Sequence, residues 1–356
     1  DALPICLDER YVPTLISKRG PVFEQQGTLF SWRIGGYREL GGLRQLFDMA
    51  RCTGLGEFRD TLLMRQLPCF HVVYADRDGN IFYAYNANAG TRGIPEEAPE
   101  ELRQRARTLD WKTPAPAALA GFTWHEPVPF DALPAIVNPP SGYVQACGNP
   151  PWRATEDAPI GPGAAPAWFV SDEDTFRAKR VRHMLRAGFR AFRDHQAMLY
   201  DTVVPGAIDL APWLVALADE HPDQVRATHP DMDAAINLLR RWRYLAERDA
   251  PGMTFFHLWW AMARAAAPPD LGPDRALHDF FLSDTPEARR RALAAAADAA
   301  RMLRNEYREI AVPWGEVHRI ARGPRYEPIF GAATGDPLFV ASDHVYKNGQ
   351  WLATYG

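Results

Sequence analysis

The sequence has 356 residues, of which 47% are hydrophobic and 24% are charged, and its formal net charge is -4 at pH 7. These values predict a globular protein with enough chain for one large domain or two ordinary ones. Basic and acidic residues are interspersed, so no extended basic field favours a nucleic acid or an anionic membrane as partner.

Three zones follow one another along the chain. Residues 1–170 are rich in Pro, Gly and β-branched or aromatic runs, with one helical window at 42–65, and predict a mostly sheet segment. Residues 171–310 have helical periodicity, and residues 311–356 return to strand and turn patterns. The sequence therefore predicts one α+β unit in which a helical insertion separates segments of sheet.

Local signals place several helices and one late hairpin. Ser171 and Asp174 have the spacing of a capping box, and Thr285 followed by Pro286 predicts a second helix start. Residues 253–267 are the most apolar window but are too short for a bilayer span, so we predict a buried helix and no membrane partner. The turn signal at 348–349, Asn-Gly between alternating strands, predicts a hairpin.

The ends of the sequence and its cysteines carry further expectations. Asp1 is not a Met and no charged-then-apolar signal segment follows, so we expect that this sequence is part of a longer chain. Cys6, Cys52, Cys69 and Cys147 have no CxxC spacing and no nearby His cluster. We expect them to be small buried hydrophobic residues, not metal ligands or catalysts.

The stretch from His71 to Arg92, HVVYADRDGNIFYAYNANAGTR, predicts a hairpin with a turn at 76–80, where Gly79 or Asn80 can adopt a positive φ. Its DRDGN segment is only partly similar to a calcium-binding EF-hand loop, because the Gly and Glu positions of that loop do not match. We expect no cofactor, and a structural calcium ion is the less favoured alternative. The polar residues at the strand ends mark the hairpin as a candidate site.

A family resemblance rests on two long motifs and four shorter ones. YADRDGNIFY, a short Asn/Gly stretch ending at Arg92, and NPPSGYVQACGNPPW at 138–152 resemble the β-chain of the penicillin acylase family. Four further pieces occur in family order: GPV at 20–22, FSWR at 30–33, FDALP at 130–134 and VPWGEVHRIARG at 312–323. The IFYAYN and NPPSGY motifs are most similar to those of the branch of acyl-homoserine-lactone and aculeacin acylases.

The resemblance implies a fold and a way of maturing. The expected fold is α+β, a partial αββα four-layer sandwich of the N-terminal nucleophile (Ntn) hydrolases with a helical insertion. The family is made by self-cleavage of an exported precursor, which implies a periplasmic or secreted location. The implied partners are a small N-acyl substrate, the missing α-chain and the missing N-terminal part of the β-chain.

The implied reaction is hydrolysis of an amide bond in an acyl-homoserine lactone, a β-lactam or a lipopeptide. The family's nucleophile is a Ser whose own α-amine is the base, because a hydroxyl alone is a poor nucleophile near neutral pH. Asp1 has neither hydroxyl nor thiol, and GPV belongs downstream of that nucleophile. We therefore expect the reacting group to lie outside this chain, and this chain alone to be inactive.

The resemblance also assigns supporting residues. The family's oxyanion-binding Asn corresponds to His71, whose neutral imidazole can donate one N–H, although a plain buried histidine is the alternative. Arg92 corresponds to the arginine that braces the site, with a solvated turn arginine as the alternative. We expect substrate contacts from Gln145 and Asn149, in a Pro-framed loop that lines the cleft, and from Asn86. Cys147 in that loop is not expected to be catalytic.

Other polar and aromatic residues receive structural interpretations. Glu316 and His318 would face the same side of a strand, and we expect a hydrogen-bonded pair there and no metal site. Trp242, Trp259 and Trp260 are expected in the core. Two classes of function stay open. The first is an amide hydrolase. The second is a non-catalytic member of the family, in which the departures from the family pattern at His71 and QACGN reflect a loss of catalysis and the sheet acts as a binding module.

Overall fold

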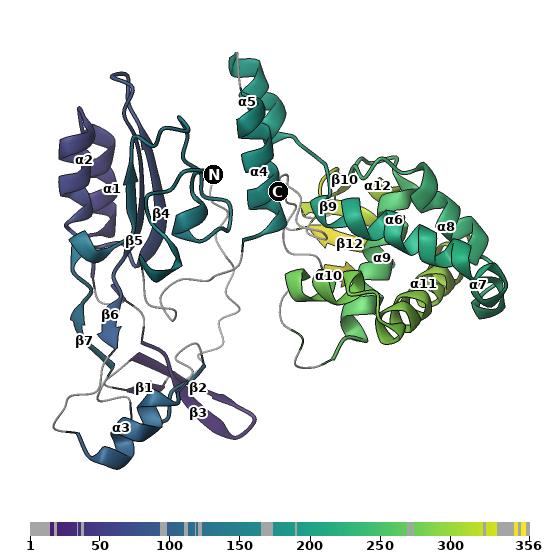
Figure 1. Ribbon diagram of the computed structural model, residues 1–356, viewed down its shortest axis with the longest axis horizontal. Coiled ribbons are helices and arrows are strands. Elements are labelled where there is room, and N and C mark those ends of the chain that lie inside the picture. Colours follow the sequence, from purple (N-terminus) through teal and green to yellow (C-terminus); the bar gives the residue numbers. More distant parts are fainter. Residues whose placement is uncertain are drawn as a thin grey trace. The chain divides into compact units, whose positions relative to one another are not determined.

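The computed structural model describes residues 15–17, 20–33, 35–36, 39–92, 98–109, 113–117, 119, 123–164, 174–188, 191–268, 271, 274–322, 325–332, 345–347 and 350–353 (Figure 1). The chain divides into two compact units. The first unit comprises Asp1–Ala146 and Pro150–Asp172, and the second comprises Cys147–Asn149 and Glu173–Gly356.

An antiparallel sheet of order β4-β5-β8 is the centre of the first unit. It consists of β4 (Cys69–Ala75), β5 (Ile81–Ala87) and β8 (Ala135–Val137). The predicted hairpin is confirmed, because β4 pairs with β5 around the turn at 76–80, where Gly79 has φ +87°. Within the turn 76–80, the position with a positive φ is thus occupied by a glycine, which adopts this conformation without strain.

Two helices cover one face of this sheet. They are α1 (Gly42–Arg51) and α2 (Leu55–Leu62), where one continuous helical window was predicted. The helix is interrupted because Cys52 and Gly54 have extended backbones. Phe58 of α2 packs against Val72 and Phe82 of the sheet in a small core. We call this side of the sheet the helix face.

The opposite side of the sheet packs against the loop 138–160. Tyr83 and Ile136 form a second small core with Ala154, joined by Val144 and Ala146 of the same loop. Because side chains alternate along a strand, odd-numbered residues of β4 and β5 share this side. We call it the loop face.

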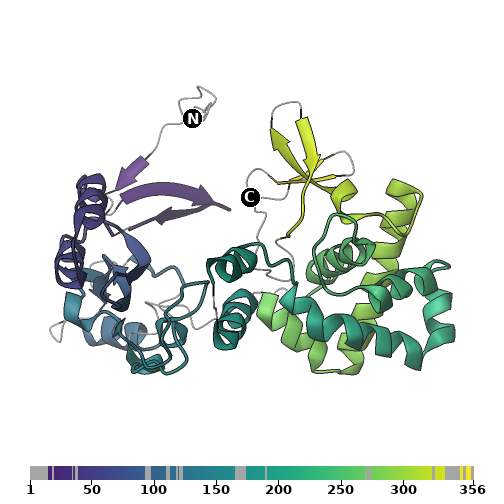
Figure 2. The ribbon, with the colours of Figure 1, turned by 90° about the horizontal axis from the view of Figure 1, so that it is seen from above.

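Further strands and short helices complete the first unit. A three-stranded meander, violet in Figure 2, consists of β1 (Leu15–Ser17), β2 (Gly20–Gln25) and β3 (Thr28–Ser31). The other described elements are α3 (Glu100–Arg107), the pair β6 (Gly90–Arg92) and β7 (Thr123–Pro127), and the 3-10 helices η2 (Phe130–Ala132), η3 (Pro151–Arg153) and η4 (Pro162–Ala164). The Arg65 guanidinium donates to the carbonyls of Ala87 and Val128, so it ties the end of β5 to the segment after β7.

Helices make up most of the second unit. They are α4 (Phe176–Ala187), α5 (Phe192–Leu199), α6 (Pro205–Glu220), α7 (Pro222–Thr228), α8 (Met232–Arg241), α9 (Pro251–Ala265), α10 (Asp274–Leu282), α11 (Pro286–Tyr307) and α12 (Trp314–Val317). The apolar window is the buried helix α9, as predicted, and Trp242, Trp259 and Trp260 lie in the core. None of the described helices is long and apolar enough to cross a membrane.

Side-chain caps set the starts of two helices. Thr285 Oγ1 accepts from the Ala288 N–H at 3.2 Å, so the predicted start of α11 is confirmed. The predicted cap of α4 is wrong in position, because Thr175 Oγ1 accepts from the Ala178 N–H. Asp174 instead forms an ion pair with Arg182, and Ser171 lies outside the described residues.

A mixed sheet of order β10-β9-β12-β11, yellow in Figure 2, follows the helices. It consists of β9 (His318–Arg322), β10 (Arg325–Pro328), β11 (Val345–Lys347) and β12 (Gln350–Ala353), with β9 and β12 parallel. Strands β11 and β12 form the predicted hairpin, and the turn 348–349 lies outside the described residues.

The residues just before β9 form a helical turn and not the expected strand. Glu316 of α12 is exposed, whereas His318, the first residue of β9, is fully buried and stacks on Trp314 with ring centroids 4.5 Å apart. Pro313 is the N-cap of this turn, and its φ of -57° is within the range that the proline ring imposes. The expected pair of Glu316 and His318 is therefore wrong, because the two side chains do not share an environment.

Candidate functional site

His71 lies on the loop face of the first sheet. It pairs across the sheet with Tyr85, whereas its neighbour Val72 packs on the helix face. The His71 ring centroid lies 5.0 Å from that of Tyr85 and 5.9 Å from that of Tyr83. The residue as a whole is exposed, although its ring packs on the tyrosines. One edge of the ring rests on tyrosines, and the other edge can reach a bound molecule.

A hydrogen bond to Tyr83 sets the tautomer of His71. The His71 Nδ1 atom lies 2.8 Å from the Tyr83 hydroxyl, and Tyr83 is fully buried. A buried O–H requires an acceptor, and Nδ1 is the acceptor beside this hydroxyl. We therefore assign the Tyr83 O–H as donor, which leaves the imidazole proton on Nε2. His71 can present a fixed N–H donor to the loop face.

The surroundings of His71 keep its ring uncharged. Burial against the tyrosines lowers the pKa of His71 below the ordinary value of 6.5, because desolvation disfavours the imidazolium. Burial likewise raises the pKa of Tyr83 and of Tyr85, so both phenols stay protonated. The Cys69 thiol donates to the Tyr85 hydroxyl at 3.4 Å. The imidazole of His71 and the phenols of Tyr83 and Tyr85 are thus uncharged at ordinary pH.

The acidic turn of the hairpin is a structural element. The Asp76 carboxylate accepts hydrogen bonds from the N–H groups of Asp78 and Asn80, from the Asn80 side-chain amide and from the Tyr74 hydroxyl. These bonds, with that from the Asn80 amide the strongest cause, lower the pKa of Asp76. Asp76 thus stabilises the turn through its own hydrogen bonds, and no bound ion is required to explain the polar residues.

The second long motif is fastened to this hairpin. Asn138, with φ +44°, accepts from the Ile81 N–H through Oδ1 at 2.8 Å and donates to Asn80 Oδ1 at 3.1 Å. Further along, the Ser141 N–H donates to Asp157 and the Tyr143 hydroxyl donates to Glu156. Much of NPPSGY is therefore scaffold that holds the loop on the loop face.

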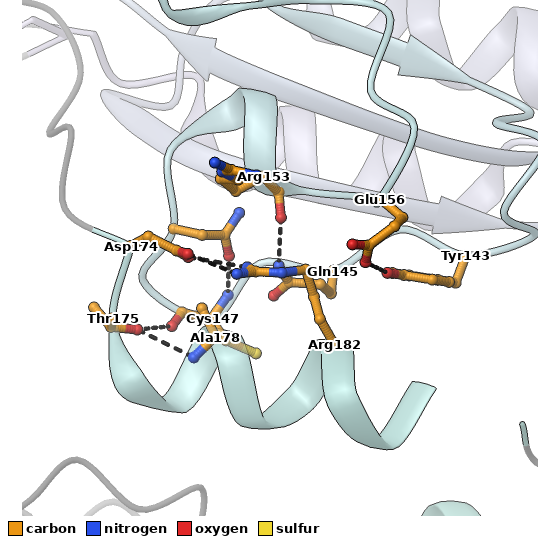
Figure 3. Close-up of polar contacts among 10 residues, drawn as sticks. Tyr143, Gln145, Cys147, Arg153, Glu156, Asp174, Thr175, Ala178 and Arg182 are labelled. Atoms are coloured by element: carbon orange, nitrogen blue, oxygen red, sulfur yellow. Dashed lines mark hydrogen bonds and ion pairs between the residues drawn. The ribbon is translucent and has the colours of Figure 1, made fainter. Parts of the chain in front are cut away.

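Gln145 is built into this loop. Its side-chain Nε2 donates to the Arg153 carbonyl at 2.8 Å (Figure 3). Its backbone N–H donates to the Ala154 carbonyl at 2.8 Å. Gln145 is buried, and within the described residues its Oε1 atom has no hydrogen-bond partner. Gln145 braces the loop with its amide nitrogen and keeps one acceptor available. Its loop and His71 share one side of the sheet.

Residues 147–149 belong to the second unit. The Asn149 side chain is buried and accepts from the Cys147 N–H at 2.8 Å. Thr175, the cap of α4, donates from its hydroxyl to the Cys147 carbonyl at 2.9 Å, as Figure 3 shows. Gly148 has φ +78° and sits close to the Thr175 side chain, so a larger residue would be strained here. These contacts give Asn149 a role in shaping the segment before α4.

Of the two other sequence-predicted residues, Asn86 is not brought to the group around His71, and the side chain of Arg92 is not described. Asn86 pairs with Phe70 and alternates with Tyr85, so its side chain points to the helix face. Arg92 ends β6 opposite Thr123, and its side chain lies outside the described residues. The structure places Asn86 on the wrong side of the sheet to contact a molecule bound at His71.

Tyr83 is the partner that sequence reasoning missed. A signal for it exists, because a turn centred on 76–80 pairs His71 with Tyr85 and sets Tyr83 on the same face two residues away. The expectation for the cysteines is also corrected. Cys69 is exposed, Cys52 and Cys147 are half-buried, and Cys6 lies outside the described residues.

The chemistry that this group offers is hydrogen-bond donation to developing negative charge. A neutral imidazole N–H, fixed by a second residue, resembles the preorganised donors that stabilise an oxyanion. In the described part of the chain, no three His, Cys, Asp or Glu side chains are grouped so that they could hold a metal ion. The group has no base beside a Ser or Thr hydroxyl, so it suits a supporting role in catalysis.

Comparisons with known proteins agree with this architecture. A family model described as penicillin amidase matches residues 8–348. Among solved structures, the chain is similar to a thermostable penicillin G acylase from Alcaligenes faecalis in an orthorhombic form, with a TM-score of 0.56 and 17% sequence identity, covering 84% of this chain and 58% of that chain. At this identity the likeness concerns the fold, and it confirms the predicted α+β class. The chain spans little more than half the length of that acylase chain.

Proposed function

The chain belongs to the penicillin amidase family, and from that premise we propose that it forms the larger part of the catalytic chain of an amide hydrolase. The hydrolase releases the acyl group from an N-acyl compound. The observation that carries the proposal is the hydrogen bond between His71 Nδ1 and the Tyr83 hydroxyl at 2.8 Å. It fixes an N–H donor at the position where the family resemblance expects the oxyanion-binding residue.

In the proposed reaction, a Ser hydroxyl at the N-terminus of the complete catalytic chain attacks the amide carbonyl while its own α-amine accepts the proton. The carbonyl oxygen becomes an oxyanion, to which Nε2–H of His71 donates. Collapse of this intermediate expels the amine of the substrate, which takes up the proton from the α-amine of the Ser, and leaves an acyl-enzyme. Water then attacks the ester of the acyl-enzyme, with the α-amine of the Ser as base. This step releases the carboxylic acid and restores the Ser hydroxyl.

A histidine serves this purpose because its ring remains neutral. The lowered pKa of His71 keeps the imidazolium form rare near neutral pH, so the charge of the oxyanion is met by a dipole and not by an ion that changes with pH. Gln145 presents a free acceptor, Oε1, in the loop on the same face of the sheet. We propose that this acceptor receives an N–H of the substrate, and that Arg92 braces the site.

The remaining parts of the proposal concern partners, substrate and location. We propose that the nucleophile and the α-chain are supplied by sequence outside these 356 residues, and the match to only 58% of the similar acylase chain is consistent with that. Exposed apolar side chains of the described residues, Leu40 and Leu43 at 96% and 84% exposure, suit further contact with protein. The motifs support the branch of acyl-homoserine-lactone and aculeacin acylases, and hence an exported enzyme acting on an N-acyl substrate such as an acyl-homoserine lactone, a β-lactam or a lipopeptide.

The test is hydrolysis by the product of the complete reading frame. We expect it to cleave an N-acyl homoserine lactone or a chromogenic phenylacetamide, and the separate 356-residue chain to cleave neither. Substitution of the first residue of the mature catalytic chain by Ala should abolish cleavage. A complete, processed protein that hydrolyses no N-acyl compound would contradict the proposal and favour a non-catalytic binding module.

A further inference from the structure

A pocket opens on the helix face of the first sheet, opposite to His71. Its lining includes Arg59 of α2, Phe82 and Asn86 of β5, and Phe130 and Asp131 of η2, and its volume is about 80 Å³. A single water needs roughly 10–15 Å³ of such space. The pocket therefore has room for several waters or for the polar head of a small molecule.

Asn86 is the buried polar group of this pocket. The residue is 1% exposed, and within the described residues neither Nδ2 nor Oδ1 of its side chain has a hydrogen-bond partner. Leaving a buried donor and a buried acceptor unpaired is unfavourable, and such groups commonly indicate a missing partner. Because both atoms are unpaired, exchanging their positions by an amide flip leaves this conclusion unchanged.

The chemistry of Asn86 selects the class of group that fits it. Its Nδ2 atom needs an acceptor and its Oδ1 atom needs a donor. A primary carboxamide supplies both from one plane, whereas a carboxylate supplies acceptors alone and an ammonium supplies donors alone. A carboxylate would also lose its hydration without an opposing charge at Asn86.

Charged residues stand at the mouth of the pocket. A wider hollow of about 330 Å³ is lined by Arg59, Asp60, Leu63 and Asp131, so it shares Arg59 and Asp131 with the inner pocket. No ion pair holds Arg59, Asp60 or Asp131 in the described part of the chain, and all three are exposed. The Arg59 guanidinium lies over the Phe82 ring, 5.9 Å from its centroid. This mouth presents one cation and two carboxylates to a ligand.

We infer that this pocket binds a free amino acid with a carboxamide side chain. The carboxamide pairs with Asn86, the α-carboxylate is held by Arg59, and the α-ammonium faces Asp131 and Asp60. Such a ligand completes the two unpaired atoms of Asn86 and matches both signs of charge at the mouth. The proposed site is distinct from the group around His71, because the side chains of Asn86 and His71 lie on opposite faces of the sheet.

The test compares L-glutamine with L-glutamate by calorimetric titration of the complete protein. The two ligands differ only in the carboxamide, so glutamine should bind at least about tenfold more tightly. Asn86→Leu should lose glutamine binding and should unfold at a higher temperature than the wild type, because an apolar side chain of similar size removes the unpaired amide. Arg59→Met should also lose affinity, whereas Leu63→Met, at the same hollow, should keep it.

Three results would overturn the inference. Equal affinity for glutamine and glutamate would mean that Asn86 does not select the ligand. Wild-type glutamine affinity in Asn86→Leu would place any binding elsewhere. The absence of glutamine binding at millimolar concentrations to a folded, complete protein would leave the pocket as a site for water only.

Discussion

The hydroxyl of Tyr83 and Nδ1 of His71 lie 2.8 Å apart, one on β5 and the other on β4, and this contact determines which nitrogen of His71 carries a proton. Tyr83 is fully buried, and its hydroxyl donates to Nδ1 of the His71 ring. The opposite edge of the ring remains accessible as an N–H donor. The hairpin thereby converts a flexible ionisable side chain into an oriented dipole.

The first prediction concerns the protonation of His71. Long-range proton–nitrogen NMR of the complete protein should show Nε2–H as the dominant neutral tautomer, with a titration midpoint below 6.5. Desolvation lowers the pKa of His71 in the folded protein below its value in the unfolded protein. The stability that is linked to the neutral ring is therefore present at pH values above the unfolded pKa, and it is lost as the pH falls through the folded pKa. A dominant Nδ1–H form, or a midpoint above 6.5, would contradict the assignment.

A second prediction separates Tyr83 from a purely structural tyrosine. Tyr83→Phe removes the hydroxyl that orients His71, and we expect kcat for N-acyl substrate to fall by about tenfold with little change in KM. In a His71→Asn background the same change should have little further effect, because an Asn amide needs no tautomer selection. Equal losses in both backgrounds would mean that Tyr83 acts on the fold and not through His71.

Asp76 gives a pH-dependent prediction about the hairpin. Hydrogen bonds lower its pKa below 3.8, so the stability that it supplies is present above that value and is lost as pH falls through the lower folded pKa. The unfolding midpoint of Asp76→Ala should therefore lie below that of the wild type at neutral pH, and the difference should shrink in acid. Asp78→Ala is the control, because the described residues donate no hydrogen bond to the Asp78 carboxylate. Identical pH profiles for both variants would contradict this account.

The helical core of the second unit yields a prediction about stability. Trp314 is fully buried and its indole N–H donates to the Gly331 carbonyl at 2.8 Å. Trp314→Phe leaves that carbonyl unpaired and removes volume, and should lower the free energy of unfolding by about 2–4 kcal/mol. Trp213→Phe, which loses a more exposed bond to Asp284, should cost about 1 kcal/mol or less. Urea denaturation of both variants measures the difference, and equal costs would contradict it.

The hairpin around Asp76 and the buried helix α9 were predictable because each follows from a local pattern. Alternation and a turn glycine define the hairpin, and a continuous apolar window defines the helix. The break between α1 and α2 was missed because helical periodicity continues through Cys52 and Gly54, while their backbones are extended. Local propensity thus identified elements better than their ends.

The site residues were harder to predict, because their grouping depends on which face of the sheet each one occupies. Asn86 was associated with His71 on the basis of its place at a strand end, although a shift of one residue along a strand reverses the side. The bonds of Asn138 to the hairpin join residues more than fifty positions apart, which no local pattern reveals. Gln145 was predicted from the family resemblance and from its Pro-framed loop, whereas its bond to Arg153 depends on the course of that loop.

The central claim, that His71 is the oxyanion donor of an amide hydrolase, is tested most directly by kcat of the complete enzyme for the wild type, His71→Ala and His71→Asn between pH 5 and 9. Loss of one such donor lowers kcat on the order of 10² to 10³. We predict that loss for His71→Ala with little change in KM, and recovery of much of the rate in His71→Asn. If His71→Ala matches the wild type at every pH, His71 does not bind the oxyanion and the claim is wrong.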